Sequence, residues 1–167
     1  MSRASARHVF WAVVATFLLV FGVHFFYASV YRYPVPAVHD EFAYLLAVDT
    51  FASGRITNPT HPMWVHFETF HVLQRPSYQA KYPPGQGAFL AIGMLLGHPA
   101  YGVWLGIALA AAATCWALAA LLPLGWAFLM PLCFLANGPV FAGWGQTYWG
   151  GGVAMAGGAL FFGGLLG

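Results

Sequence analysis

The sequence contains very little charge. Only 6% of its 167 residues are charged, whereas 60% are hydrophobic. Residues 85–167 contain no Asp, Glu, Lys or Arg at all. A folded domain in water needs surface charge to stay solvated and unassociated, so this composition excludes an ordinary soluble domain. The formal net charge of +2 is also too small to indicate a nucleic-acid partner.

Cysteine is scarce as well. Cys115 and Cys133 both lie in apolar stretches, where they are expected to pack as small core residues rather than to form a disulfide framework. Four histidines of the polar stretch lack the spacing of a zinc site, so the sequence assigns no metal ligands; they are His39, His61, His66 and His71. No cofactor follows from the residues, and a requirement for a divalent metal stays open.

The apolar residues are arranged as membrane-spanning segments. Residues 9–30 carry no formal charge and are interrupted only by His24, which suffices for one span of about 20 residues. Because this core is too long for a signal peptide, we expect an uncleaved anchor. Residues 85–167 have room for roughly three to four further spans. The predicted fold class is an all-α integral membrane bundle of about four to five spans, formed by a single membrane domain over residues 1–167.

Residues 31–84 form a polar loop between the first span and the later ones. Within it, apolar residues at three- and four-residue spacing predict a short amphipathic helix over residues 38–52, with Gly54 as its stop. Residues 58–76 predict a second amphipathic surface helix, broken by prolines. Arg3 and Arg7 favour a cytoplasmic N-terminus, but the loop holds basic residues too, so charge alone leaves the orientation undecided.

The acidic pair Asp40 and Glu41 is the first candidate for chemistry. A carboxylate beside a bilayer can act as a general base toward a hydroxyl nucleophile. The alternative is structural, since acids in the first turn of a helix complement its dipole and cap its free N–H groups.

Lys81 and Tyr82 form the second candidate, where prolines and glycines lead the chain back toward the membrane. An ammonium at this height can hold a lipid phosphate and stabilise charge as a phosphate ester bond breaks. Arg55 and Arg75 are candidates for the same role. The alternative is an interfacial anchor, because Lys and Tyr commonly lie at the ends of membrane helices.

Tyr148 and Trp149 lie in an aromatic cluster over residues 144–151. Sugar rings stack well on Trp and Tyr, which makes both residues candidates for substrate binding. An interfacial aromatic belt has the same appearance in a sequence.

Taken in order, these pieces resemble the GT-C superfamily of polytopic glycosyltransferases. The resemblance is to the bacterial branch related to protein O-mannosyltransferases and lipid A aminoarabinose transferases. A first span is followed by an acidic pair, here Asp40 and Glu41, then by surface helices and a Tyr-Pro-Pro element beginning at Tyr82. The Thr-Tyr-Trp-Gly-Gly sequence of residues 147–151 is similar to uncharacterised bacterial members. The likeness covers nearly all of this chain but only the N-terminal third of such an enzyme, so we expect an N-terminal portion.

The resemblance implies a concrete activity. Such enzymes transfer a hexosyl or pentosyl group from a polyprenyl-phosphate carrier to an acceptor glycan, lipid or protein outside the cytoplasm, with inversion at the anomeric carbon. Asp40, with Glu41 beside it, would act at the acceptor as base or orienting group. Lys81 and a loop arginine would bind the leaving phosphate. The resemblance also places the N-terminus in the cytoplasm, the protein in the inner membrane as a multi-pass component of the cell envelope, and residues 31–84 outside.

Other classes of protein remain as alternatives. One is a non-catalytic membrane subunit or scaffold with the same fold. Another is a transporter or metal-handling protein, which is disfavoured because such proteins place ionisable residues inside their spans, and here only His24 and His98 qualify.

Overall fold

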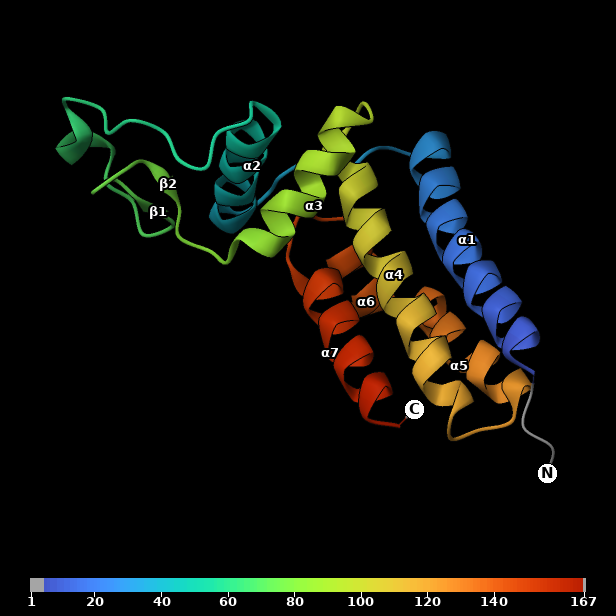
Figure 1. The fold of residues 1–167 in the computed structure, drawn as a ribbon. Coiled ribbons are helices and arrows are strands. Elements are labelled where there is room, and N and C mark those ends of the chain that lie inside the picture. The colour runs from blue at the N-terminus through green and yellow to red at the C-terminus, as the bar shows by residue number, and fades with distance from the viewer. Residues whose placement is uncertain (1–4, 167) are drawn as a thin grey trace.

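The computed structural model describes residues 5–166, and this part of the chain is mostly helical (Figure 1). Seven α-helices, one 3-10 turn and one short hairpin follow each other along these residues. They are α1 (Ala6–Val30), α2 (His39–Ala52), η1 (Trp64–Phe67), β1 (Val72–Leu73), β2 (Gln79–Ala80), α3 (Pro84–Leu95), α4 (Pro99–Ala119), α5 (Leu124–Ala136), α6 (Gly138–Gly145) and α7 (Gly151–Leu166).

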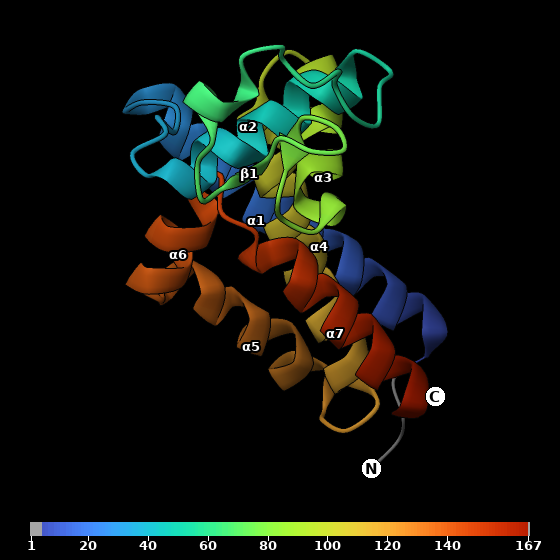
Figure 2. The same ribbon diagram turned by 90° about the vertical axis from the view of Figure 1, so that its left-hand side faces the viewer.

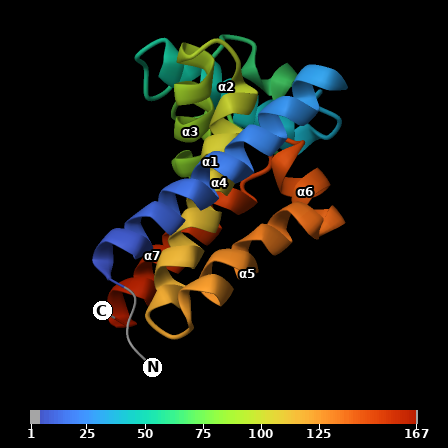
Figure 3. The same ribbon diagram turned by 90° about the vertical axis from the view of Figure 1, so that its right-hand side faces the viewer.

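Helix α4 is the central element of the fold. It packs against α1, α3, α5 and α7. Alanine is the strongest helix former, and its small side chain lets neighbouring helices approach closely. Alanines accordingly make up much of the buried surface of α4, together with the fully buried Trp104 and Ile107. Figure 3 shows α1 and α5 running alongside this helix.

Helices α3 and α4 form a hairpin in very close contact. A Cβ atom at Gly102 would lie 2.0 Å from the carbonyl oxygen of Phe89, and one at Gly93 would lie 2.3 Å from the backbone nitrogen of Gly102. Gly97 turns the chain between the two helices at a φ of +124°, a conformation that favours glycine. The ring of His98 then accepts a hydrogen bond from Ala100 N and caps α4.

Two helices, α1 with 25 residues and α4 with 21, are long and apolar enough to cross a membrane. Helices α5 and α6 would add a third span if counted together, although they bend by 71° at Asn137. The expected four to five spans are therefore not confirmed. The apolar tract is divided at Asn137, whose side chain caps α6 by accepting from Val140 N. Two such helices nevertheless indicate membrane association.

The polar loop folds into α2 and a lobe of irregular structure, residues 54–83. The predicted helix over residues 38–52 is confirmed as α2, which packs against α3. The predicted helix over residues 58–76 is wrong. That segment contains only η1 and one strand of the β1–β2 hairpin, with Val72 opposite Ala80. Its prolines cannot donate the backbone hydrogen bonds of a helix interior.

The loop lobe and α2 lie at one end of the helices. Figures 1 and 2 show them at the end opposite the start of α1 and the end of α7. The turn between α4 and α5 lies at the same end as these termini (Figure 1). The acidic pair and the 147–151 segment, which are far apart in the sequence, meet at the end near α2.

Candidate active site

Asp40 lies in the first turn of α2, where it meets two other segments of the loop. The Tyr82 hydroxyl donates a hydrogen bond of 2.6 Å to Asp40 Oδ1. His71 Nδ1 lies 2.7 Å from the same oxygen and 2.7 Å from the Tyr82 hydroxyl. Among residues 5–166, no side chain or backbone group forms a hydrogen bond or ion pair with the second carboxyl oxygen, Oδ2. Asp40 is therefore held by one oxygen and has the other free.

The Tyr82 hydroxyl group is protonated at neutral pH and acts as a hydrogen-bond donor in this arrangement. Burial, followed by the hydrogen bond to Asp40, raises the pKa of the Tyr82 phenol to about 12. The Tyr44 ring stacks on Tyr82 at 4.9 Å, and burial together with the charge of Asp40 also raises the pKa of Tyr44. Two neutral phenols thus flank the carboxyl group.

An open cavity of about 400 Å³ lies beside Asp40. Its lining comes from α2 and from the segment around the start of α7: Asp40, Tyr44, Trp144, Trp149, Gly150 and Gly151. A Cβ atom at Gly150 would lie 3.1 Å from the Tyr44 hydroxyl, and one at Gly151 would lie 2.3 Å from the Trp144 ring. Small residues thus keep this wall close to the aromatic rings. Aromatic faces beside a carboxyl group are surfaces on which a sugar ring can stack.

Glu41 is buried, with 2% of its surface exposed. Its Oε2 accepts hydrogen bonds from Ala37 N at 2.8 Å and Val38 N at 3.2 Å, and its Oε1 accepts one from Tyr148 N at 2.9 Å. These bonds join the start of α2 to the segment that leads into α7. Both oxygens are therefore occupied by backbone N–H groups inside the protein.

Tyr148 is buried as well and completes the same junction. Its hydroxyl donates to the carbonyl oxygen of Pro34 at 2.8 Å. Burial, followed by the charge of Glu41, raises the pKa of Tyr148 to about 12. Gln86 of α3 donates to the carbonyl oxygens of Tyr148 and Trp149, at 3.1 and 3.0 Å. Tyr148 thus fixes the backbone that presents Trp149, whose own side chain is 42% exposed.

The three predicted phosphate-binding cations do not gather at the Asp40 cavity. Lys81 Nζ donates to the Phe70 carbonyl oxygen at 3.1 Å and lies 3.5 Å above the Phe70 ring. It lines a separate cavity of about 430 Å³ between α2 and the loop lobe. The remaining two have partners within the lobe or next to it: Arg55 pairs with Asp49 at 3.2 Å and bonds Asn58, and Arg75 lies 4.8 Å above the Trp64 ring.

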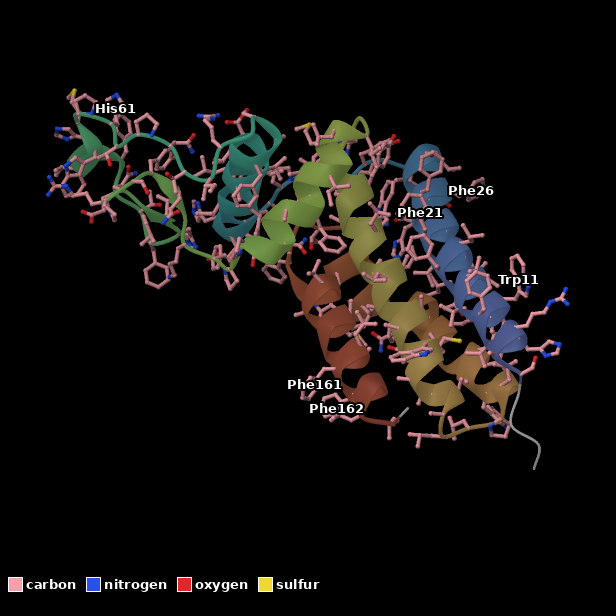
Figure 4. The ribbon with its side chains drawn as sticks, in the orientation of Figure 1. Trp11, Phe21, Phe26, His61, Phe161 and Phe162 are labelled. Atoms are coloured by element: carbon pink, nitrogen blue, oxygen red, sulfur yellow. The ribbon has the colours of Figure 1, made fainter. Side chains whose placement is uncertain are left out.

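The structure adds residues to the site that the sequence did not assign to it. Tyr44 lines the Asp40 cavity and Gln86 holds the 148–149 backbone, and neither was singled out in the sequence. His71 was considered only as a metal ligand but contacts Asp40, and Trp144, a member of the 144–151 aromatic cluster, lines the same cavity. Gln86 had a sequence signal, since a polar amide in an otherwise apolar stretch needs a buried partner. His61 lies in the loop lobe (Figure 4). Within the described residues 5–166, no group of three or more His, Cys, Asp or Glu side chains could hold a metal ion.

Comparisons with known proteins identify no relative of this chain. No protein-family model, no curated protein and no solved structure matches the chain.

Proposed function

We propose that this chain forms the catalytic part of an inverting membrane glycosyltransferase that uses a polyprenyl-phosphate sugar donor. The observation that carries the proposal is the Asp40 carboxyl group, which is bonded to Tyr82 through one oxygen and is free at the other. It borders a cavity with Trp and Tyr rings, at the end of helices long enough to cross a membrane. A base, a surface for a sugar and a lipid environment thus lie together.

In the proposed reaction, Asp40 accepts the proton of an acceptor hydroxyl through Oδ2. The hydroxyl oxygen forms a bond to the anomeric carbon, and the bond between that carbon and the phosphate oxygen breaks. The electron pair leaves with the polyprenyl phosphate. Because attack and departure occur on opposite faces of the sugar, the anomeric configuration inverts. General-base catalysis of this kind contributes roughly 10²- to 10⁴-fold to a rate.

The surrounding residues have positioning roles in this proposal. Tyr82 and His71 hold Oδ1 and so aim Oδ2 at the acceptor. Trp149 and Trp144 offer rings for the sugar. Glu41 and Tyr148 act through the backbone of the 147–149 segment and do not touch substrate, because their polar atoms are already bonded inside the protein.

The proposed orientation follows from the same function. Polyprenyl-linked sugars are used on the outer side of the inner membrane, so the loop and α2 would face outward and the start of α1 would face the cytoplasm. The positions of α2 and of the start of α1 at opposite ends of the helices support this arrangement (Figure 1).

The test is a transfer assay in membranes. Membranes from cells with the gene and from cells with a deletion receive polyprenyl phosphate carrying a labelled pentose or hexose. We expect label to enter glycan, lipid or protein only when the gene is present, with the anomeric configuration opposite to that of the donor. Equal transfer in both membranes, with the protein still bound to a complex of the envelope, would instead identify a non-catalytic subunit.

A further inference from the structure

A third cavity, of about 490 Å³, lies between the end of α1 and α6. Both elements lie on the same side of α4 in Figure 3. The lining combines one cation, one amide, two phenols and apolar residues: Tyr27, Arg32, Tyr33, Pro34, Val35, Pro36, Ala37, Phe141, Ala142 and Gln146. A mixed lining of this kind suits the polar end of an amphiphile at the surface of a membrane.

Arg32 is the cation of this cavity. Its side chain is exposed. Within residues 5–166 its guanidinium group forms no hydrogen bond or ion pair, whereas the guanidinium group of Arg55 is paired with Asp49. Guanidinium groups bind phosphate with two parallel N–H bonds, which makes arginine the preferred residue for a phosphate ester. Arg32 therefore has its full binding capacity available where Arg55 does not.

Gln146 supplies a fixed polar group on the opposite wall. Its amide nitrogen lies 3.0 Å from Nδ1 of His24, a residue that is fully buried in α1. Stacking of His24 on Phe141 at 4.5 Å orients the ring that holds the amide. An amide nitrogen carries two N–H groups and only one is used here. The second N–H group can still donate a hydrogen bond.

We infer that this cavity binds the phosphate of a membrane lipid through the Arg32 guanidinium and the Gln146 amide. The lipid is either a polyprenyl phosphate or a phospholipid, and its identity as the donor carrier rests on the proposed function. This cavity and the one beside Asp40 share no lining residue, but most of their lining comes from neighbouring parts of two chain segments, residues 32–44 and 141–151. In this inference the phosphate is held by Arg32 and not by Lys81, which lines a different cavity.

The experiment measures binding and does not require transfer. The protein, expressed from its complete coding frame, is purified into phosphatidylcholine nanodiscs and titrated with short-chain polyprenyl phosphate. We expect Arg32→Gln to weaken binding about tenfold or more, as loss of a charge-assisted hydrogen bond predicts. Arg55→Gln is the matched control, since it removes the same charge from an arginine that is already paired, and we expect less than about a twofold change.

The outcomes separate the lipid sources and the two proposals. Competition by phosphatidylglycerol at equal affinity supports the site and assigns it to phospholipids, whereas competition only by polyprenyl phosphate supports it as the carrier site. Equal losses from Arg32→Gln and Arg55→Gln would overturn the inference in favour of bulk attraction, and so would a loss confined to Lys81→Gln. We expect Asp40→Asn to bind polyprenyl phosphate as the wild type does. If binding depends on Arg32 but the wild-type protein transfers no sugar, only the proposed function is refuted and the lipid site stands.

Discussion

Asp40 and Glu41 are neighbours in the sequence with opposite surroundings. Asp40 keeps a carboxyl oxygen free at the edge of a cavity. Glu41 has both oxygens bonded to backbone N–H groups in the interior. Consecutive residues at the start of a helix point about 100° apart, which explains why one faces the cavity and the other the core. The sequence offered both as catalytic carboxylates, with Asp40 as the base or orienting group, and only long-range contacts distinguish them.

Tyr148 makes the stability of this junction decrease as the pH rises in the alkaline range. The pKa of its phenol is about 12 in the folded protein and about 10 in an unfolded chain. The neutral phenol therefore contributes stability that is present below pH ~10 and is lost as the pH rises toward ~12, because the unfolded chain then binds fewer protons. We expect the melting temperature in detergent to fall across this interval.

The variant Tyr148→Phe isolates that contribution. It should be less stable than the wild type near neutral pH, because the Pro34 carbonyl oxygen loses its donor, at a cost of about 1–3 kcal/mol. It should also lose less stability between pH ~10 and ~12. Melting curves with the same alkaline slope for both proteins would show that Tyr148 does not titrate there.

At the scale of elements, Glu41 joins the start of α2 to the segment before α7. Glu41→Gln replaces one acceptor oxygen with an NH₂ group that faces backbone donors. We expect a loss of about 3 kcal/mol or more in unfolding free energy and a lower amount of folded protein. Glu68→Gln is the control, because Glu68 is exposed in the loop lobe. A stable but inactive Glu41→Gln protein would mean that Glu41 acts on substrate instead.

The hairpin of α3 and α4 depends on glycine at its crossing. A methyl group at Gly102 would overlap the backbone of Phe89, so the two helices must move apart. We expect Gly102→Ala to destabilise the protein by roughly 1–3 kcal/mol in thermal unfolding. Gly157→Ala is the matched control in α7, since nothing lies within 4 Å of a Cβ atom there. Equal melting temperatures for both variants would contradict this close packing.

Elements with strong local patterns could be predicted from the sequence. Helix α1 follows from its long uncharged stretch of mostly apolar residues, and α2 from its helical periodicity. The loop lobe could not be predicted, because its fold depends on pairings between distant residues such as Asn58 and Tyr78. The same reason applies to the site. Asp40 stood out as a titratable residue, but its contacts with His71 and Tyr82 arise only when the lobe folds back onto α2.

For the whole molecule, the proposed function predicts that the end of the helices with the loop lobe faces outward. The loop lobe and the α4–α5 turn lie at opposite ends (Figure 1). In a protein with Cys115 and Cys133 replaced, a membrane-impermeant maleimide should label Thr69→Cys in intact cells. It should label Leu121→Cys, which is 62% exposed at the other end, only after permeabilisation. The reverse pattern would contradict an outward-facing Asp40.

The most direct test of the central claim compares two aspartates of α2. Asp40→Asn removes the proposed base, whereas Asp49→Asn makes the same chemical change at a side chain that is 72% exposed and paired with Arg55. We would measure transfer of labelled sugar from polyprenyl phosphate in membranes with equal amounts of each protein. We expect Asp40→Asn to lower the transfer rate roughly 10²- to 10⁴-fold and Asp49→Asn to retain the wild-type rate. Wild-type transfer by a well-folded Asp40→Asn protein would contradict the claim.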